Sequence, residues 1–220
     1  MRKALITGAS RGIGKAIKEL FEEKGLKVYA PTREEMDLSS NDSIANYINS
    51  LTEDIDILIN NAGINDLAGM DELNDDLIQS MMQVNLLSQL KLIELLSKPM
   101  KKNNYGRIVN IASIWCDFSK ERRLLYSIAK AGVKGLTTAS AVELSKYNVL
   151  VNAIAPGFVN TEMTSQNNTP EQIKELAEAL PVKRLAQPKE IAEIIYFLAS
   201  EQNSFMTGQT IFADGGFSCV

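Results

Sequence analysis

The chain has 220 residues, of which 45% are hydrophobic and 23% are charged; its net charge is −4, and it contains no histidine and two cysteines. This composition is typical of a soluble globular protein, and we expect a single domain over residues 1–220. No basic cluster indicates nucleic-acid binding, no apolar run is long enough to cross a membrane, and the N-terminus does not resemble a signal peptide. The only cysteines are Cys116 and Cys219, so we expect neither a zinc site nor a disulfide framework. Two cysteines without such a framework favour a cytoplasmic location.

The first residues predict a strand, a glycine-rich turn and a helix in that order. Residues 3–7 form an apolar run of strand length, and apolar positions recur at helical spacing over residues 15–21. Glycines permit a tight turn and let the backbone approach a pyrophosphate, while a helix N-terminus offers free N–H groups. Glycine turns without a ligand also join strands to helices, but three glycines in this context favour a dinucleotide site. The expected contacts are Gly8, Ser10, Arg11, Gly12, Ile13 and Gly14.

The rest of the chain alternates strand and helix signals. Strands are predicted at 27–30, 55–59, 107–111, 150–154 and 210–213, and helices at 43–51, 75–102 (one helix or two joined), 125–147, 170–179 and 188–200. This alternation predicts an α/β, Rossmann-like doubly wound parallel sheet with helices on both faces. Ligands of such sheets bind beyond the carboxyl ends of the strands, where residues 60–63, Ser113 and residues 156–157 would meet.

Tyr126 and Lys130 are the strongest indication of chemistry. Because the chain has no histidine, acid–base catalysis near neutral pH needs another side chain with a shifted pKa. A phenol titrates near pH ~10 unless a nearby cation favours its phenolate. Residues i and i+4 share one face of a helix, so Lys130 can place its ammonium beside Tyr126. On its own, such a pair is more often a half-buried tyrosine beside a solvated lysine.

Taken together, the motifs resemble the short-chain dehydrogenase/reductase family in its single-domain form, and most closely the bacterial 3-oxoacyl-carrier-protein reductases. The resemblance rests on residues 7–14, on residues 60–63, on the spacing from Ser113 to Tyr126 and Lys130, on Pro156-Gly157 followed by Thr161, and on residues 214–216. It implies an oxidoreductase that transfers a hydride between a nicotinamide cofactor and a carbonyl or alcohol substrate.

The resemblance also implies four catalytic residues. Tyr126 would donate a proton to the reduced carbonyl, or accept one in the oxidative direction, and Ser113 would orient the carbonyl oxygen. Lys130 would lower the pKa of Tyr126 and hold the ribose of the cofactor. Asn85 would lie where a water can link Lys130 to solvent. Considered singly, Ser113 could be a cap after a strand and Asn85 a surface amide.

The choice of coenzyme depends on the end of the second strand. Enzymes that select NAD usually place an acidic residue there, whereas this chain has Arg33, which together with Arg11 could pair with a 2′-phosphate. Glu34 and Glu35 could oppose that phosphate, and Arg33 could be a solvated loop residue. NADP is therefore favoured and NAD stays possible. The further cofactor contacts that the resemblance implies are Asp37, Leu38, Asn61, Ala62, Gly63, Tyr126, Lys130, Pro156, Gly157, Val159 and Thr161.

The chain departs from the family pattern after the second strand. Only residues 33–35 separate Thr32 from residues 36–39, which resemble the end of the family's third strand. A parallel pair normally needs a crossover of about a dozen residues with a helix. We therefore expect the intervening helix to be missing and the third strand to be short or irregular.

The substrate is not determined by the sequence. The expected walls of its pocket, residues 114–125 and 161–182, do not distinguish an acyl thioester from a sugar, a steroid or a small ketone. In the family, helices corresponding to residues 75–100 and 125–146 pack against a second subunit, so a homodimer or homotetramer is expected. Two alternatives to a carbonyl reductase are a nucleotide-sugar reductase, epimerase or dehydratase of the same fold and a non-catalytic nicotinamide-sensing protein.

Overall fold

A six-stranded parallel sheet forms the centre of the structure, a computed structural model that describes residues 1–220. The strands lie in the order β2-β1-β3-β4-β5-β6. Their bounds are β1 (Lys3–Ile6), β2 (Lys27–Tyr29), β3 (Ile57–Asn60), β4 (Gly106–Ile111), β5 (Val149–Pro156) and β6 (Thr210–Ala213). The strand order reverses between β1 and β3, and a crevice at the carboxyl edge of a sheet is expected at such a point.

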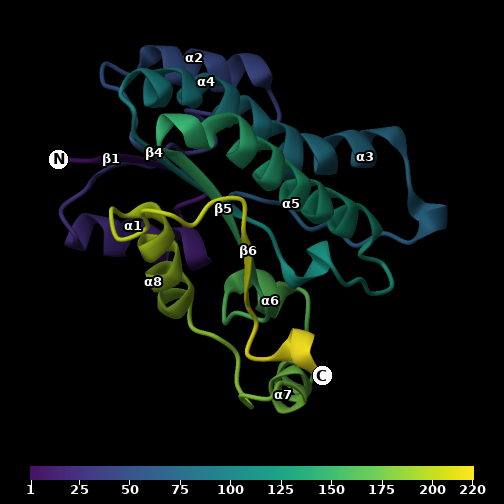
Figure 1. The fold of residues 1–220 in the computed structure, drawn as a ribbon. Coiled ribbons are helices and arrows are strands. Elements are labelled where there is room, and N and C mark those ends of the chain that lie inside the picture. Colours follow the sequence, from purple (N-terminus) through teal and green to yellow (C-terminus); the bar gives the residue numbers. More distant parts are fainter.

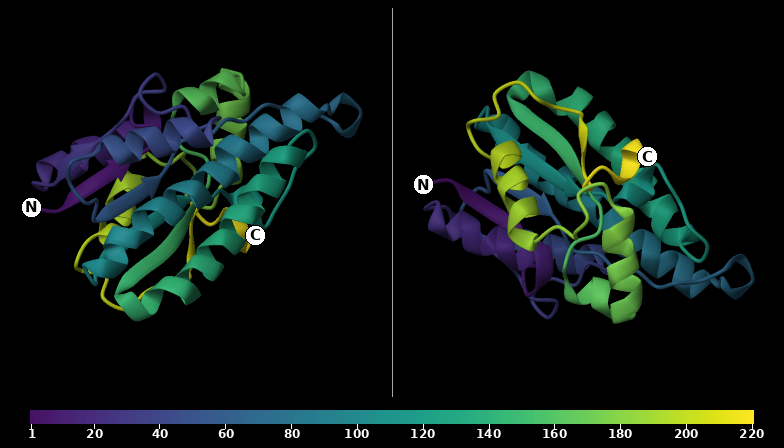
Figure 2. Two further views of the ribbon diagram at one scale, coloured as in Figure 1. Left: turned by 90° about the horizontal axis from the view of Figure 1, so that it is seen from above. Right: turned by 90° about the horizontal axis from the view of Figure 1, so that it is seen from below.

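Helices cover both faces of this sheet, as Figure 1 shows. α1 (Gly12–Glu23) and α8 (Pro188–Ala199) pack together on one face, and α2 (Asn41–Ser50), α4 (Ser88–Lys102) and α5 (Leu124–Leu144) cover the other. α6 (Glu162–Gln166) and α7 (Pro170–Ala179) lie beyond the strand ends near the C-terminus, and α3 (Asp75–Met82) projects with its preceding loop at one end of the molecule (Figure 2). The predicted doubly wound fold is therefore confirmed.

The two faces of the sheet carry separate hydrophobic layers because successive side chains of a strand point to opposite sides. In β3, Ile57 and Ile59 pack in the layer of α1 and α8, whereas Leu58 packs in the layer of α2, α4 and α5. All residues of β3, β4 and β5 are buried. A parallel strand covered on both faces needs such continuous apolar sequence, which is why these strands were recognisable.

Local sequence signals also set several helix boundaries. The Ser40 hydroxyl accepts a hydrogen bond from the Ser43 N–H at the start of α2. Thr169 and Gln172 form a reciprocal capping box before α7, where Pro170 occupies the first turn. No helix combines the length and the apolar character needed to cross a lipid bilayer.

The predicted shortening after the second strand is confirmed, but the expected third strand does not form. Residues 33–35 make a turn, closed by a 3.0 Å hydrogen bond from the Met36 N–H to the Thr32 carbonyl, and the chain then enters α2. β1 pairs with β2 on one side and with β3 on the other, so β2 is the edge of the sheet. Met36 is buried against the layer of α2 and α4, which anchors the turn without a strand.

Candidate active site

A cleft of about 320 Å³ opens at the carboxyl edge of the sheet, among the loops that follow β1, β3, β4 and β5. It is lined by every residue that the sequence predicted for catalysis or cofactor binding except Asn85, Arg33, Asp37 and Leu38. The predicted residues that line it are Gly8, Ser10, Arg11, Gly12, Ile13, Gly14, Asn61, Ala62, Gly63, Ser113, Tyr126, Lys130, Pro156, Gly157, Val159 and Thr161.

The glycine turn is tied to the loop after β3. The Thr7 hydroxyl accepts hydrogen bonds of 3.0 Å from the N–H groups of Asn61 and Ala62. The Asn61 amide donates in return to the carbonyls of Thr7 and Gly8, at 2.9 and 3.0 Å. A Cβ atom at Gly14 would lie 2.1 Å from the Gly8 carbonyl oxygen, so the helix can approach the turn only without a side chain there.

The N-terminus of α1 is suited to an anionic ligand. No side chain caps this helix, and its first turn contains no acidic residue. The N–H groups of that turn and the helix dipole therefore favour phosphate at the end of the helix that lines the cleft. This observation, with the close-packed glycines, fits a dinucleotide.

Lys130 lies at the base of the cleft and is buried. Its Nζ donates a 2.6 Å hydrogen bond to the carbonyl oxygen of Ile111 and lies 5.5 Å from the centre of the Tyr126 ring. Burial lowers the pKa of Lys130 to about 8, although the neighbouring Cys116 acts in the opposite direction. The lysine therefore remains mostly protonated at pH 7.

The pKa of Tyr126 is raised in the structure, whereas the sequence predicts that Lys130 lowers it. Burial raises the pKa of its phenol to about 12, and the Ser113 hydroxyl and the Arg123 guanidinium act against that rise. Lys130, whose ammonium is bonded to the Ile111 carbonyl, is not among the groups that lower this pKa. The role of Lys130 in lowering this pKa stays a prediction, and the groups that act against the rise in this structure are Ser113 and Arg123.

Ser113 both caps the turn after β4 and lies beside Tyr126. Its hydroxyl accepts a 3.3 Å hydrogen bond from the Trp115 N–H and so caps a 3₁₀ turn (Ile114–Cys116) after β4. The same hydroxyl lines the cleft and interacts with the phenol of Tyr126. A cap after a strand and a group beside the tyrosine are therefore compatible.

Asn85 lies outside the cleft but supports its wall. It is fully buried in a π-helical turn (Gln83–Leu87) between α3 and α4, and is not a surface amide. Its side chain accepts from the Ile64 N–H and donates to the Ile64 carbonyl, both at 3.0 Å. A Cβ at Gly63 would lie 2.8 Å from its Oδ1 and 3.8 Å from Lys130 Nζ, so Asn85 positions the loop that separates it from the lysine.

Known proteins with the same architecture place this cleft in a family. The family model described as enoyl-(acyl carrier protein) reductase matches residues 30–218. The 3-oxoacyl-(acyl-carrier-protein) reductase FabG of Vibrio cholerae is 35% identical over 238 residues, which cover 99% of this chain and 97% of that protein. The chain belongs to the short-chain dehydrogenase/reductase family. It is an oxidoreductase, and the family resemblance of its motifs is confirmed.

Other relatives of this short-chain dehydrogenase/reductase extend the comparison. The acetoacetyl-CoA reductase of Shinella zoogloeoides is 37% identical over 237 residues, with 98% of each chain covered. The structure of 4-hydroxyisoleucine dehydrogenase complexed with NADH matches with a TM-score of 0.95 and 29% identity over 100% of both chains. ElxO with NADP bound matches with a TM-score of 0.92 and 28% identity, covering 100% of this chain and 99% of that one.

The residues predicted near the adenine end lie outside the cleft of this family member. Arg33 is 85% exposed, and its Nε is 3.8 Å from the Asp37 carboxylate. Hydrogen bonds from the N–H and hydroxyl of Ser39 lower the pKa of Asp37, with the charge of Arg33 adding to that effect. The Leu38 carbonyl accepts a 3.2 Å hydrogen bond from Gln83. These residues form their own turn beside the cleft.

Five further residues line the cleft, namely Ile111, Ala112, Glu162, Met163 and Thr164. Residues 162–164 lie in the segment 161–182 predicted as a wall of the substrate pocket, whereas residues 111 and 112 were not predicted to contact a ligand. Glu162 pairs with Arg11 at 3.1 Å, which joins the glycine turn to α6 across the cleft. The Thr161 hydroxyl accepts a hydrogen bond from the Thr164 N–H at the start of α6, and a threonine at this position is a helix-start signal from which α6 could have been predicted.

Proposed function

We propose that the protein is an NADP(H)-dependent carbonyl reductase that also runs in reverse as an alcohol dehydrogenase. One observation carries the proposal: a single cleft is lined by the glycine turn and by Ser113, Tyr126 and Lys130. A protein that only sensed nicotinamide would need the turn alone.

The chain has groups suited to each end of a dinucleotide cofactor. The residues of the turn, Gly8 to Gly14, would hold the pyrophosphate, and Lys130 with residues 156–161 would hold the nicotinamide end. When bound, the nicotinamide supplies the hydride that reduces a carbonyl carbon, or accepts it from an alcohol.

The chain's own residues would manage the charge on oxygen. In the reductive direction, the carbonyl π bond breaks, the carbon gains a hydride, and the oxygen takes a proton from Tyr126 to become a hydroxyl. Ser113 would donate a hydrogen bond to that oxygen and orient it. The resulting phenolate would be stabilised by the cations nearby, Lys130 and Arg123. Overall, the ketone, NADPH and one proton become the alcohol and NADP⁺.

Three features support NADP(H) over NAD(H). The residues after β2 are Ala30, Pro31 and Thr32, which provide no carboxylate for a ribose 2′-hydroxyl. Arg33 is 85% exposed, so its guanidinium could pair with a 2′-phosphate, and Arg11 lines the cleft, where it is paired with Glu162 and could exchange that partner for the phosphate. The Glu35 carboxylate accepts a hydrogen bond from the Thr32 N–H within the turn, which engages one of the two acids that could oppose the phosphate.

The substrate class proposed first is a compound with a 3-oxoacyl group, whether acid, ester or thioester, because relatives over nearly the whole chain are named as 3-oxoacyl and acetoacetyl-CoA reductases. We also propose a homodimer or homotetramer. Ile128 and Val142 on α5 are 48% and 74% exposed, and apolar helix faces of this kind are suited to burial against a second copy. The free thiols of Cys116 and Cys219 fit a cytoplasmic location.

The proposal is tested by mixing the purified protein with NADPH and a panel of ketones that includes acetoacetyl-CoA, and following the loss of reduced-nicotinamide absorbance. A Tyr126→Phe variant should bind NADPH like the parent but turn over at least ~100-fold more slowly, because general acid catalysis is lost. Reduction at the parental rate by this variant would remove Tyr126 from the mechanism.

A further inference from the structure

Arg123 is the one arginine whose side chain has no hydrogen-bonding or ionic partner in the protein. The other arginines all have one: Arg2 pairs with Asp56 and Glu201, Arg11 with Glu162, Arg33 with Asp37, Arg122 with Glu72 and Arg184 with Glu190, and Arg107 donates to main-chain carbonyls. Guanidinium groups that are partly removed from water normally acquire such partners. Arg123 is therefore an exception, and its free N–H donors can bind an anionic ligand.

The position of Arg123 places its charge beside the proposed proton donor. It is the residue before α5 and lies three positions before Tyr126. It is partly buried, and its guanidinium carbon lies 5.9 Å from the centre of the Trp115 ring. Burial lowers the pKa of Arg123, and the guanidinium in turn acts against the raised pKa of the Tyr126 phenol. The cation thus acts on the same hydroxyl that would protonate a substrate.

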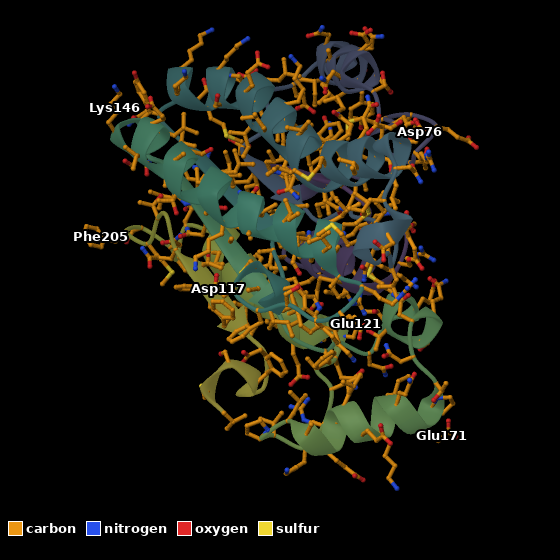
Figure 3. The ribbon with its side chains drawn as sticks, turned by 90° about the vertical axis from the view of Figure 1, so that its right-hand side faces the viewer. Asp76, Asp117, Glu121, Lys146, Glu171 and Phe205 are labelled. Atoms are coloured by element: carbon orange, nitrogen blue, oxygen red, sulfur yellow. The ribbon has the colours of Figure 1, made fainter.

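The surface next to Arg123 is aromatic and supplies no counter-ion. Trp115 contacts Phe158 and Phe217 edge-on, at 6.4 and 6.3 Å between ring centres, and Phe217 contacts Phe118 at 5.7 Å. None of the acids of the neighbouring loops pairs with Arg123, and Glu121, two residues before it, forms no ion pair (Asp117 and Glu121 are labelled in Figure 3). Asp117 is bonded to Lys134 at 2.7 Å, and Glu72 is bonded to Arg122 at 2.8 Å. A guanidinium against aromatic rings loses hydration without a compensating carboxylate, so an anionic ligand gains more from it there than in open water.

We propose that Arg123 binds a carboxylate of the substrate, so that the compound reduced is a short oxo acid rather than its neutral ester or thioester. This inference rests on the proposed function. Arg123 precedes Tyr126 by three positions at the start of α5, and its charge acts on the phenol, so a carboxylate paired with Arg123 would lie near a carbonyl bonded to Tyr126 and be separated from it by few bonds. A 3-oxo acid meets that requirement. The phosphate at the far end of a thioester's pantetheine arm does not, because many more bonds separate it from the carbonyl.

The aromatic cluster and Arg123 would act together on such a compound. The flat guanidinium can donate hydrogen bonds to both carboxylate oxygens in a bidentate pair, which fixes the direction of the chain between the carboxylate and the ketone. The rings of Trp115 and Phe217 would cover the apolar carbons of that chain. Arg123 is then a specificity-determining residue for the reaction that Tyr126 completes.

The test uses matched acids and esters in the NADPH oxidation assay: acetoacetate against methyl acetoacetate, and 4-oxopentanoate against its methyl ester. Acetoacetyl-CoA is included as the corresponding thioester. The variants are Arg123→Met, which keeps an apolar stem against Trp115, and Arg122→Met, a matched control whose guanidinium is exposed and paired with Glu72. NADPH binding and thermal unfolding of each variant establish that it is folded.

The unmutated protein should have a higher kcat/KM for each acid than for the methyl ester of that acid. Arg123→Met should lower kcat/KM for the acids about 10- to 100-fold, the loss expected when one charged hydrogen-bonding partner is removed, and mostly through KM. The same variant should lower kcat/KM for the esters much less than for the acids and should leave their KM unchanged, because the esters make no ion pair and lose only the effect of the guanidinium on Tyr126. Arg122→Met should behave like the parent with every compound.

Three results would overturn the inference. Equal losses on acids and esters in Arg123→Met would show that the guanidinium serves the tyrosine or the fold and not a carboxylate. A parent that prefers the ester or acetoacetyl-CoA to the acid would exclude the assigned substrate class while leaving the reductase activity intact. If the parent oxidises NADPH with none of these compounds or any other carbonyl, the proposed function fails and this inference with it.

Discussion

Lys130 and Ile111 are joined by a 2.6 Å hydrogen bond from the lysine Nζ to the isoleucine carbonyl oxygen. Ile111 ends β4, and Lys130 lies one helical turn beyond Tyr126 on α5, so this bond holds the face of the helix that carries both residues to the edge of the sheet. No carboxylate pairs with the buried ammonium. The protein therefore keeps a cation at the base of the cleft at a cost in desolvation, which is reasonable where that charge is used on a cofactor or a phenolate.

Replacing Lys130 should flatten the dependence of stability on pH. The pKa of Lys130 is about 8 in the folded protein against 10.5 for an ordinary lysine. Between these values the unfolded chain binds a proton that the folded protein does not, so the free energy of unfolding should rise with pH, by up to about 3 kcal/mol across the window. Urea unfolding at pH 7 to 10 should show this rise in the parent and not in Lys130→Met. Identical slopes in the two proteins would contradict the burial of a titrating lysine.

The sequence was sufficient for features that arise from local patterns. The glycine turn and the pairing of Tyr126 with Lys130 depend on neighbours within one helix or one turn, so their spacing alone indicated them. The fully apolar run of β3 showed a strand covered on both faces. The site follows because the strands are parallel, which brings the loops after them to a single edge.

Features that depend on contacts between distant segments were not predictable. The amide of Asn85 is held by Ile64, and a spacing pattern contains no information about that partner. Arg11 and Glu162 are 151 positions apart, so their ion pair exists only after folding. The pKa of Tyr126 was assigned from one neighbour on its helix, whereas burial by the whole fold sets its direction. The stretch at 36–39 forms no strand, because Met36 packs in the core without a sheet neighbour.

An alanine at Gly14 should disrupt the cleft, whereas an alanine at Gly135 should not. A Cβ at Gly14 would lie 2.1 Å from the Gly8 carbonyl oxygen and 2.4 Å from the Asn61 amide, so the turn must move. Gly135 is inside α5 with open space around its Cα, on the face that carries Ile128 and Val142 and away from the cleft, so alanine there should leave NADPH binding unchanged. Gly14→Ala should lose roughly 2 kcal/mol or more of stability, as overpacked sites do, together with NADPH binding. Thermal unfolding and NADPH fluorescence titration measure both effects, and unimpaired NADPH binding by Gly14→Ala would remove the turn from the cofactor site.

Removing the Arg33 side chain should weaken selection for NADPH over NADH. Arg33 is 85% exposed and held only by a 3.8 Å approach to Asp37, so its guanidinium is available for a 2′-phosphate. Arg33→Ala should raise KM for NADPH about tenfold, the effect of losing one charge-assisted hydrogen-bond partner, and leave KM for NADH unchanged. Lys18→Ala, which deletes an exposed charge of the same sign on α1, should alter neither constant. If the ratio of the two KM values is the same in Arg33→Ala as in the parent, Arg33 does not select the coenzyme, and Arg11 in the glycine turn becomes the residue to replace next.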